Sequence, residues 1–285
     1  MILVTGATGS NGMELLKLLA SRRVPARAMV RSADKAGTIA GLPGIEIVAG
    51  DFDDPPTLDR ALDGIDRAFL LTSSTERAEA QQLAFVSAAV RNGVGNVVKL
   101  SQFAADEDSP VRFLRYHARV ERAIRESGLE YTFLRPNLFM QGLLAFVPTI
   151  RSQGQFFAAI DDAAVSVVDV RDIAAAAAAA LTGDRHANRT YTLTGSQALT
   201  HAEMAAQLSE AVGRRIGFID ITEEAMRDAL SRMGMPEWQA DGLIEDYAHY
   251  RRGEVSEVCT GVQDATGSRP RSFAAFARDY AWAFS

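Results

Sequence analysis

Cysteine is almost missing from this sequence. Its single cysteine, Cys259, cannot form a disulfide bond within the chain. One thiol in 285 residues fits a reducing compartment, so we expect a cytoplasmic protein. No apolar run approaches the roughly 18–20 residues of a membrane span. Met1 leads straight into Ile2, Leu3 and Val4 with no basic leader, and we therefore expect neither a signal peptide nor a membrane partner.

A concentrated basic surface is missing as well. The formal net charge is −6 at pH 7, and charged residues make up 23% of the chain. Because proteins that bind nucleic acid usually carry a basic footprint, we expect a small-molecule partner and no nucleic acid. With 47% hydrophobic residues, the chain suffices for one large domain or a domain with a smaller lobe. The oligomeric state stays open, with a homodimer as one option.

Motifs for a nucleophile or a metal ion are also absent. The sequence has no Gly-x-Ser-x-Gly elbow. Three of its four histidines, His186, His201 and His249, belong to no recognisable pattern, and we interpret them as structural. Since no metal-ligand spacing is left, we expect no metal site.

The first half of the sequence alternates short apolar segments with helical patterns. Such alternation predicts a parallel sheet with helices on both faces. We therefore predict an α/β fold: a Rossmann doubly wound parallel sheet with a smaller C-terminal α/β substrate lobe. Strands are expected at residues 2–5, 26–30, 46–49, 67–71, 96–100 and 131–134, and helices at 12–21, 56–62, 78–92 and 116–127.

The second half is less regular. Residues 142–155 are apolar and helical, short strands are expected within 156–170, and a further strand at 190–194. Seven consecutive alanines, Ala174 to Ala180, favour a helix at 171–182 that packs very close to the sheet. Helices are also expected at 200–212 and 223–233, and Thr200 stands three residues before Glu203, which is the capping-box spacing.

A glycine-rich loop joins the first predicted strand to the first predicted helix. Glycine lets the backbone turn sharply and approach a pyrophosphate, while the free N–H groups of the helix start attract phosphate. A tight turn without a ligand is the alternative, but the place in the first βα unit favours a dinucleotide. We expect cofactor contacts from Thr5, Gly6, Thr8, Gly9, Ser10, Asn11 and Gly12.

The end of the second predicted strand indicates which dinucleotide binds. NAD-binding proteins often place an acidic residue there to hold the ribose 2′-hydroxyl. Here the strand ends in Arg31, a planar donor that suits a 2′-phosphate, and Lys35 is near in sequence. A solvated surface arginine is the alternative. We therefore predict NADP(H) as cofactor, preferred over NAD(H).

Further candidate contacts follow the third and fourth predicted strands. Asp51 and Phe52 mark the corner expected beside the adenine, and Thr72 and Ser73 follow the fourth strand. The carboxyl ends of parallel strands form the edge at which open α/β sheets bind ligands. Residues 1–137 with about 165–195 are thus expected to form the NADP-binding Rossmann domain, and 138–164 with 196–285 the smaller substrate-binding lobe.

Several segments resemble one group of atypical short-chain dehydrogenases. The opening VTGATGSNG at residues 4–12 is similar to that group, and residues 131–137, 168–174 and 191–195 resemble its NmrA-like branch. Within that branch, which the chain resembles over nearly its whole length, the quinone reductase, triphenylmethane reductase and azoreductase members are nearest. The resemblance implies that Ser101, Pro136 and Asn137 border the nicotinamide. Because the branch also contains catalytically silent redox sensors, it specifies the fold and the cofactor better than the substrate.

The Tyr-x-x-x-Lys pair of typical short-chain dehydrogenases is absent. In that pair, lysine lowers the tyrosine pKa for proton transfer, but here Val120 stands four residues after Tyr116. The family register places Phe113 at the tyrosine and His117 at the lysine, with Glu121 one turn further along. Because histidine donates protons near neutral pH, we predict His117 as catalytic and Glu121 as the carboxylate that keeps it protonated. A surface histidine in an ordinary ion pair is the alternative.

Loss of this pair disfavours alcohol oxidation. Hydride transfer from NADPH to an electron-poor substrate needs mainly close stacking of the substrate in an apolar pocket. We predict an NADPH-dependent reductase that transfers hydride to a small, flat, electron-poor substrate such as a quinone or an azo dye. A non-catalytic redox sensor is the alternative, and a nucleotide-sugar epimerase ranks last because it usually needs the tyrosine. The pocket walls are expected from Phe103, Phe139, Met140, Leu144 and Phe157, with Met233, Met235 and Trp238 opposite, although such residues are more often ordinary core.

Overall fold

Seven parallel strands form the central sheet of the computed structural model, in the order β3-β2-β1-β4-β5-β6-β8. The structure describes residues 1–285 along the backbone, and the side chains of all of them except residues 33–35 and 38. The strand order reverses between β1 and β4, as in Rossmann folds, which leaves a crevice at the carboxyl edge. The strands are β1 (Ile2–Val4), β2 (Ala26–Val30), β3 (Ile45–Ala49), β4 (Arg67–Leu70), β5 (Asn96–Leu100), β6 (Glu130–Pro136) and β8 (Arg189–Leu193).

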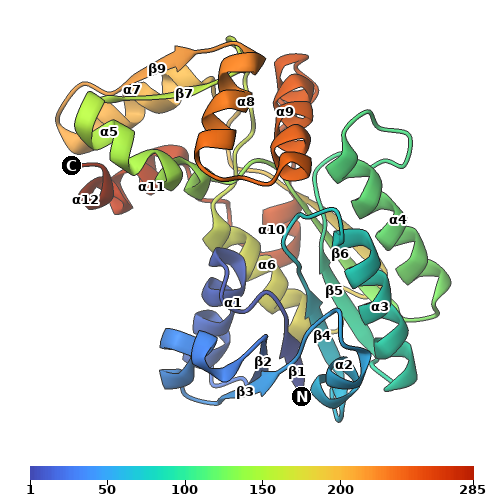
Figure 1. The fold of residues 1–285 in the computed structure, drawn as a ribbon. Helices are drawn as coiled ribbons and strands as arrows, with labels where there is room; N and C mark the ends of the chain where they lie inside the picture. Colours follow the sequence, from blue (N-terminus) through green and yellow to red (C-terminus); the bar gives the residue numbers. More distant parts are fainter.

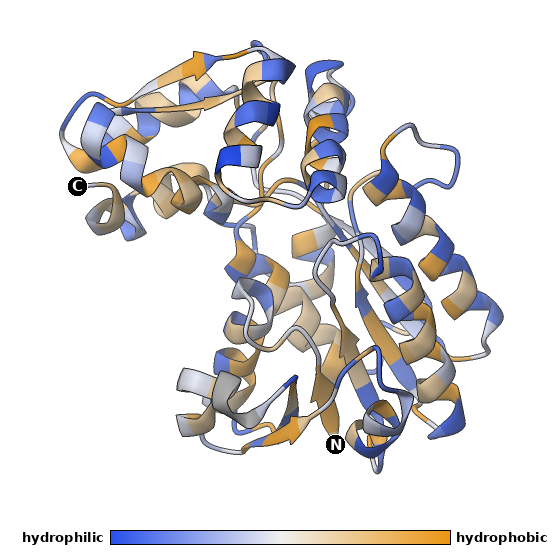
Figure 2. Ribbon diagram, viewed as in Figure 1, coloured by the Kyte–Doolittle hydropathy of each residue, from blue (hydrophilic) through white to orange (hydrophobic). Residues whose placement is uncertain are grey.

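Helices cover both faces of this sheet, which confirms the predicted fold class (Figure 1). The central strands consist largely of hydrophobic residues, whereas the helices carry both hydrophilic and hydrophobic residues (Figure 2). The short η1 (Ala33–Gly41) follows β2. One face carries α1 (Ser10–Ser21), α6 (Val170–Thr182) and α10 (Gly261–Thr266), and the other carries α2 (Pro55–Leu62), α3 (Ala78–Arg91) and α4 (Arg112–Glu126).

The alanine run lies in α6, as predicted. Most of its alanines, such as Ala176 and Ala177, are fully buried against the sheet and α1. Alanine has a high helix propensity, and its small methyl side chain lets two backbones approach closely. The run is therefore packed structure and not a low-complexity segment.

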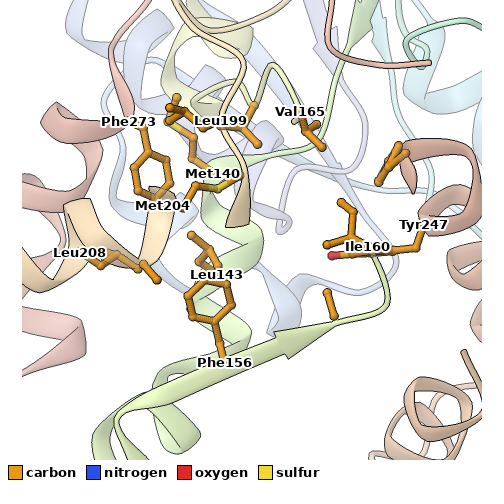
Figure 3. Close-up of a cluster of buried hydrophobic side chains, with 14 of the residues drawn as sticks. Met140, Leu143, Phe156, Ile160, Val165, Leu199, Met204, Leu208, Tyr247 and Phe273 are labelled. Atoms are coloured by element: carbon orange, nitrogen blue, oxygen red, sulfur yellow. The ribbon is translucent and has the colours of Figure 1, made fainter. Parts of the chain in front are cut away.

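A second group of elements lies above the carboxyl ends of the strands (Figure 1). Its two-stranded parallel sheet pairs β7 (Gln155–Ala158) with β9 (Gly217–Asp220). The side chains of Figure 3, among them Met140, Leu143 and Phe156, belong to its own hydrophobic core, which supports the predicted two-lobe division as a proposal. Its helices are η2 (Met140–Phe146), α5 (Val147–Gln153), α7 (His201–Val212), α8 (Glu223–Arg232), α9 (Glu237–Arg251), α11 (Phe273–Asp279) and α12 (Ala281–Phe284).

The sequence patterns located the sheet and most of its helices, but they missed β9, α9, α10, α11 and α12. The predicted capping box is present, since the Thr200 hydroxyl accepts from the Glu203 N–H and Glu203 bonds the Thr200 N–H. Helix α4 begins at Arg112, one turn before the predicted start. The buried face of α9 includes Asp246 and His249, so its apolar periodicity is interrupted. Among the described residues, no helix is both long and apolar enough to cross a membrane.

Candidate active site

The glycine loop forms a tight cradle at the carboxyl end of β1. Gly6 has φ of +59°, and a Cβ there would lie 2.8 Å from Leu71 Cγ. A Cβ on Gly12 would lie 2.3 Å from the Gly6 carbonyl oxygen, so both positions require glycine for the turn itself. Gly9 differs, because its Cβ would meet nothing nearer than that same oxygen at 3.4 Å. The fold alone therefore tolerates a side chain at Gly9, and only a ligand requires its absence.

The surroundings of the loop also fit a dinucleotide. Gly9 is the N-cap of α1 and Ser10 is its first residue, so the loop presents free N–H groups of a long helix. Asn11 is buried, lines the cavity described below, and its Oδ1 has no hydrogen-bond partner among the described residues. Thr8 is exposed beside it. Thr5 instead bonds the carbonyls of Phe69 and Leu71 at 2.9 and 3.0 Å, which positions the loop on β4.

The predicted adenine-side contacts lie along the same edge of the sheet. Arg31 is exposed directly after β2, the strand beside β1, while the Lys35 side chain lies outside the described residues. Asp51 Oδ1 accepts from the backbone N–H of Asp53 at 3.0 Å, and the Phe52 ring packs on Phe85. After β4, Thr72 Oγ1 accepts from Gln82 at 2.8 Å, and Ser73 stands next to it, exposed.

A cavity of about 300 Å³, here called the edge cavity, lies at the carboxyl ends of β4, β5 and β6. It is partly polar, and helix α9 covers it from the C-terminal lobe. Glu121 lies behind its wall, and Met140 lines a separate cavity in the lobe. The edge cavity brings together Asn11, Thr72, Ser101, Phe103, His117, Pro136, Asn137 and Phe139 from the sequence prediction. Among the described residues, no group of three or more potential ligands for a metal ion occurs.

His117 is bonded to a lysine that the sequence prediction did not include. Lys99, fully buried on β5, lies 2.7 Å from His117 Nδ1 and also donates to the Leu100 carbonyl. Burial lowers the Lys99 pKa to about 7, against the attraction of Glu121. Burial, the Lys99 charge and the Arg135 charge together hold the His117 pKa well below its ordinary value. The imidazole is therefore neutral, with Lys99 as donor and the ring proton on Nε2.

The predicted pairing of His117 with Glu121 is wrong in this geometry. The Glu121 carboxylate is fully buried and bonds Ser101 at 2.6 Å, Arg125 at 2.9 Å, and Arg135 at 2.9 and 2.6 Å. Burial alone raises its pKa, but the Arg135 and Ser101 hydrogen bonds lower it more. These bonds keep the carboxylate ionised and hold the Ser101 hydroxyl in place. The negative charge of Glu121 also stabilises the Lys99 ammonium.

Asn137 also has a supporting role. Its amide donates to Ser166 Oγ at 2.8 Å and to the Val255 carbonyl at 2.9 Å, and its Oδ1 accepts from the Leu138 N–H. These bonds tie the end of β6 to two distant segments. The backbone after Pro136 is thereby fixed at the cavity wall.

Helix α9 supplies a polar group to the edge cavity. Gly242 lets α9 approach α4 closely, since a Cβ there would lie 2.4 Å from the Phe113 ring. One turn further, buried Asp246 accepts from Gln102 at 3.0 and 2.9 Å, and burial raises its pKa to about 7 although Gln102 and Tyr250 bond it. His249, which we interpreted as structural, also lines the cavity, with Nδ1 bonded to Glu254.

Lys99, which lies beside the edge cavity, carried a signal in the sequence that our prediction did not use. Lys99 interrupts an otherwise apolar strand, Val97-Val98-Lys99-Leu100, where a buried charge needs a partner. Asp246 carried no such signal, because its helix had no apolar periodicity to place it. Gln102 and Tyr250 likewise become part of the site only through tertiary contact.

A Lys99→Met variant should be more stable than the native chain at pH 6.5. In the unfolded chain Lys99 keeps its ordinary pKa of 10.5, so between pH 7 and 10.5 the unfolded chain holds a proton that the folded chain has lost. Native stability therefore rises with pH over this window, and the full cost of the buried charge is present below pH 7. At 1.36 kcal/mol per pKa unit, the fall from 10.5 to about 7 corresponds to a gain in the variant on the order of 5 kcal/mol.

Urea unfolding of both proteins at pH 6.5, 8.0 and 9.5 measures this difference. The difference in unfolding free energy between the two proteins should shrink as the pH rises, because only the native chain contains the buried Lys99 that loses its proton. If the free energy of unfolding changes with pH in the same way in the variant and the native chain, the Lys99 pKa is not depressed in the folded protein.

Comparison with known proteins gives the family. A family model described as the NmrA-like family matches residues 1–273. An NAD(P)H azoreductase from Xenophilus azovorans is 40% identical over 284 residues, which are 100% of this chain and 99% of the azoreductase. A (4-alkanoyl-5-oxo-2,5-dihydrofuran-3-yl)methyl phosphate reductase from Streptomyces griseus is 39% identical over 286 residues, with 100% and 99% covered. The crystal structure of an Escherichia coli NADPH-dependent quinone oxidoreductase with NADPH has a TM-score of 0.87 at 27% identity, covering 98% of this chain and 99% of the other.

Proposed function

Because this chain belongs to the NmrA-like family, we propose that it is an NADPH-dependent reductase of small, flat, electron-poor acceptors such as quinones and azo dyes. The observation that carries the proposal is the edge cavity, where His117, Ser101 and Asp246 surround the space beside the glycine cradle. The azoreductase and the quinone oxidoreductase support the acceptor class. We place this activity in the cytoplasm, in keeping with the single thiol.

The chain binds the cofactor through the edge of the sheet. The backbone of residues 6–12 holds the pyrophosphate against the start of α1, and the Asn11 amide faces the same space. Arg31 holds the 2′-phosphate, and Ser101 and Pro136 border the nicotinamide. When bound, NADPH supplies the hydride that reduces the acceptor.

Proton delivery falls to the pair of His117 and Lys99. Because Nδ1 of His117 accepts from Lys99, its Nε2 carries the proton that a reduced quinone oxygen or azo nitrogen needs. As that proton leaves Nε2, the Lys99 ammonium gives its own proton to Nδ1. The imidazole then never holds two protons, which fits its depressed pKa. Glu121 acts as a positioning residue, since it holds Ser101 and Arg135 and balances the Lys99 charge.

A direct assay tests this function. NADPH oxidation is followed by its absorbance, with a panel of short-chain quinones and azo dyes as acceptors. We expect turnover with at least one class and none without an acceptor. Tight NADPH binding with no acceptor reduced would overturn the enzyme proposal and favour the redox-sensor alternative.

The cofactor preference depends on Arg31. NADPH should bind more tightly than NADH by about 1–3 kcal/mol, the usual contribution of a charge-assisted hydrogen bond. Calorimetry with both cofactors measures this preference, and Arg31→Ala should remove most of it. Arg22→Ala, at the exposed C-cap of α1, is the matched control and should keep it. If Arg31→Ala retained the native preference, the assignment of the 2′-phosphate would fail.

A further inference from the structure

The C-terminal lobe contains a cavity that is larger than the edge cavity. This lobe cavity has a volume of about 580 Å³, nearly twice that of the edge cavity. Its walls come from η2, α5, β7, α7, α8 and α9. Figure 3 shows four of its wall residues, Met140, Leu143, Met204 and Tyr247, within the core of the lobe.

The chemistry of this wall favours an uncharged, apolar occupant. No carboxylate lines the cavity, and its one arginine, Arg232, is exposed. Burial lowers the His201 pKa to about 4 and raises the Tyr247 pKa to about 12, so both side chains are uncharged near pH 7. A cation inside would have no counter-charge and an anion could meet only the exposed Arg232, whereas a hydrocarbon loses nothing by leaving water.

The two cavities adjoin. Leu138, Phe139 and Leu243 line both of them. Phe139 follows β6 and Leu243 lies on α9, so the shared wall is at the junction of the sheet and the lobe. One ligand can therefore place a polar head beside His117 and Asp246 and an apolar extension in the lobe.

We propose that the lobe cavity binds the hydrocarbon tail of an acceptor whose electron-poor head occupies the edge cavity. The inference rests on the proposed reductase function and narrows it to tailed, amphiphilic acceptors. A methylene takes up about as much space as a water molecule, roughly 30 Å³, so a chain of about ten carbons fills about half of the lobe cavity. Met204, Met226 and Met235 suit such a chain, because the flexible thioether adapts to different shapes.

The test is a homologous series of 2-alkyl-1,4-benzoquinones with chains of one, four, seven and ten carbons. Each methylene transferred from water to an apolar site contributes about 0.8 kcal/mol, so kcat/KM should rise by up to about fourfold per carbon. The rise should appear mainly in KM, since the head and its surroundings stay the same. The matching hydroquinone dimethyl ethers accept no hydride. Calorimetry with these ethers measures how the binding constant depends on chain length.

Two substitutions on α8 separate the cavity from the rest of the helix. Ala229→Phe fills the cavity and should flatten the chain-length dependence, while the methyl quinone is reduced at the native rate. Ala225→Phe, on an exposed position of the same helix, is the matched control and should keep the native series. If Ala229→Phe does not fold, Ala145→Phe on η2 fills the same cavity from another side.

The outcomes separate this inference from the proposed function. If the methyl quinone is reduced and longer chains give no gain in kcat/KM or in binding, the proposal of a tail site is wrong, while the proposed reductase function is supported. A second result is that no quinone is reduced, but the ethers bind more tightly with each methylene and Ala229→Phe abolishes that gain. This result would support the tail site and contradict the proposed reductase function. A chain-length gain that survives in Ala229→Phe and Ala145→Phe would place the tail elsewhere and overturn the inference.

Discussion

His117→Ala should lower kcat for a quinone by about 10²–10⁴-fold, the usual contribution of a general acid, while NADPH binds with nearly native affinity. In the proposed relay, the alanine removes the group that passes the Lys99 proton to the edge cavity. Reduction of a cationic triphenylmethane dye should be much less affected, because its carbon accepts hydride and needs no proton. Single-turnover rates with one quinone and one such dye measure both effects.

Companion variants test the pathway of the proton. Glu121→Gln should act in the same direction as His117→Ala but more weakly, since Glu121 only supports the network. Native kcat for the quinone should fall as the pH rises above about 7, where Lys99 loses its proton, and Lys99→Met should lack this fall. His186→Gln, a buried histidine bonded to Tyr191 away from the edge cavity, is the control.

Two results would contradict the relay. Unchanged rates for both acceptors in His117→Ala would make the histidine a bystander and leave positioning as the whole of catalysis. Asp246 is the second group with a pKa of about 7 in this cavity. If Asp246→Asn and not Lys99→Met removes the fall of kcat with pH, the proton comes from α9.

Gly9→Val should weaken NADPH binding by at least about 100-fold while the chain stays folded. Gly9 has φ of −81° and ψ of 168°, which is extended backbone that valine adopts readily, and its Cβ has room. In the complex, the valine side chain stands where the backbone approaches the pyrophosphate. Calorimetry for binding and circular dichroism for the fold measure the two effects separately.

Gly12→Ala is the contrasting substitution. Its Cβ would lie 2.3 Å from the Gly6 carbonyl oxygen, so the loop must shift and the melting temperature should fall. A folded Gly9→Val protein that binds NADPH normally would show that the loop is only a turn.

The sheet and its cofactor loop were predictable because both are local patterns. Six strands of the first half, the Gly6–Gly12 loop and the alanine helix each follow from periodicity or spacing within a few residues. Periodicity also placed His117 and Glu121 one turn apart on α4, which is correct. It did not show that their partners are Lys99 and Arg135, because these come from neighbouring strands.

The acceptor side of the site was harder to predict. Gln102 and Asp246 are 144 positions apart in sequence and meet only when α9 packs on α4. That packing depends on Gly242 against Phe113, a contact that no short-range pattern reveals. Phe103 and Phe139 were placed in the pocket because they follow predicted strands, whereas Tyr250 and Leu243 lie on a helix that the patterns missed.

The burial of Lys99 gives a way to measure local opening of the structure around β5. Lysine occurs in this chain only at positions 17, 35 and 99. With its pKa near 7, Lys99 is the amine most often unprotonated at neutral pH, yet it has no exposed surface. A small amine-reactive reagent can acylate Lys99 only when the structure around β5 opens. The rate of acylation at Lys99, measured by peptide mass spectrometry, therefore reports how often this opening occurs. Slower labelling of Lys99 with NADPH present, at an unchanged Lys17 rate, would measure closure without any acceptor or added dye.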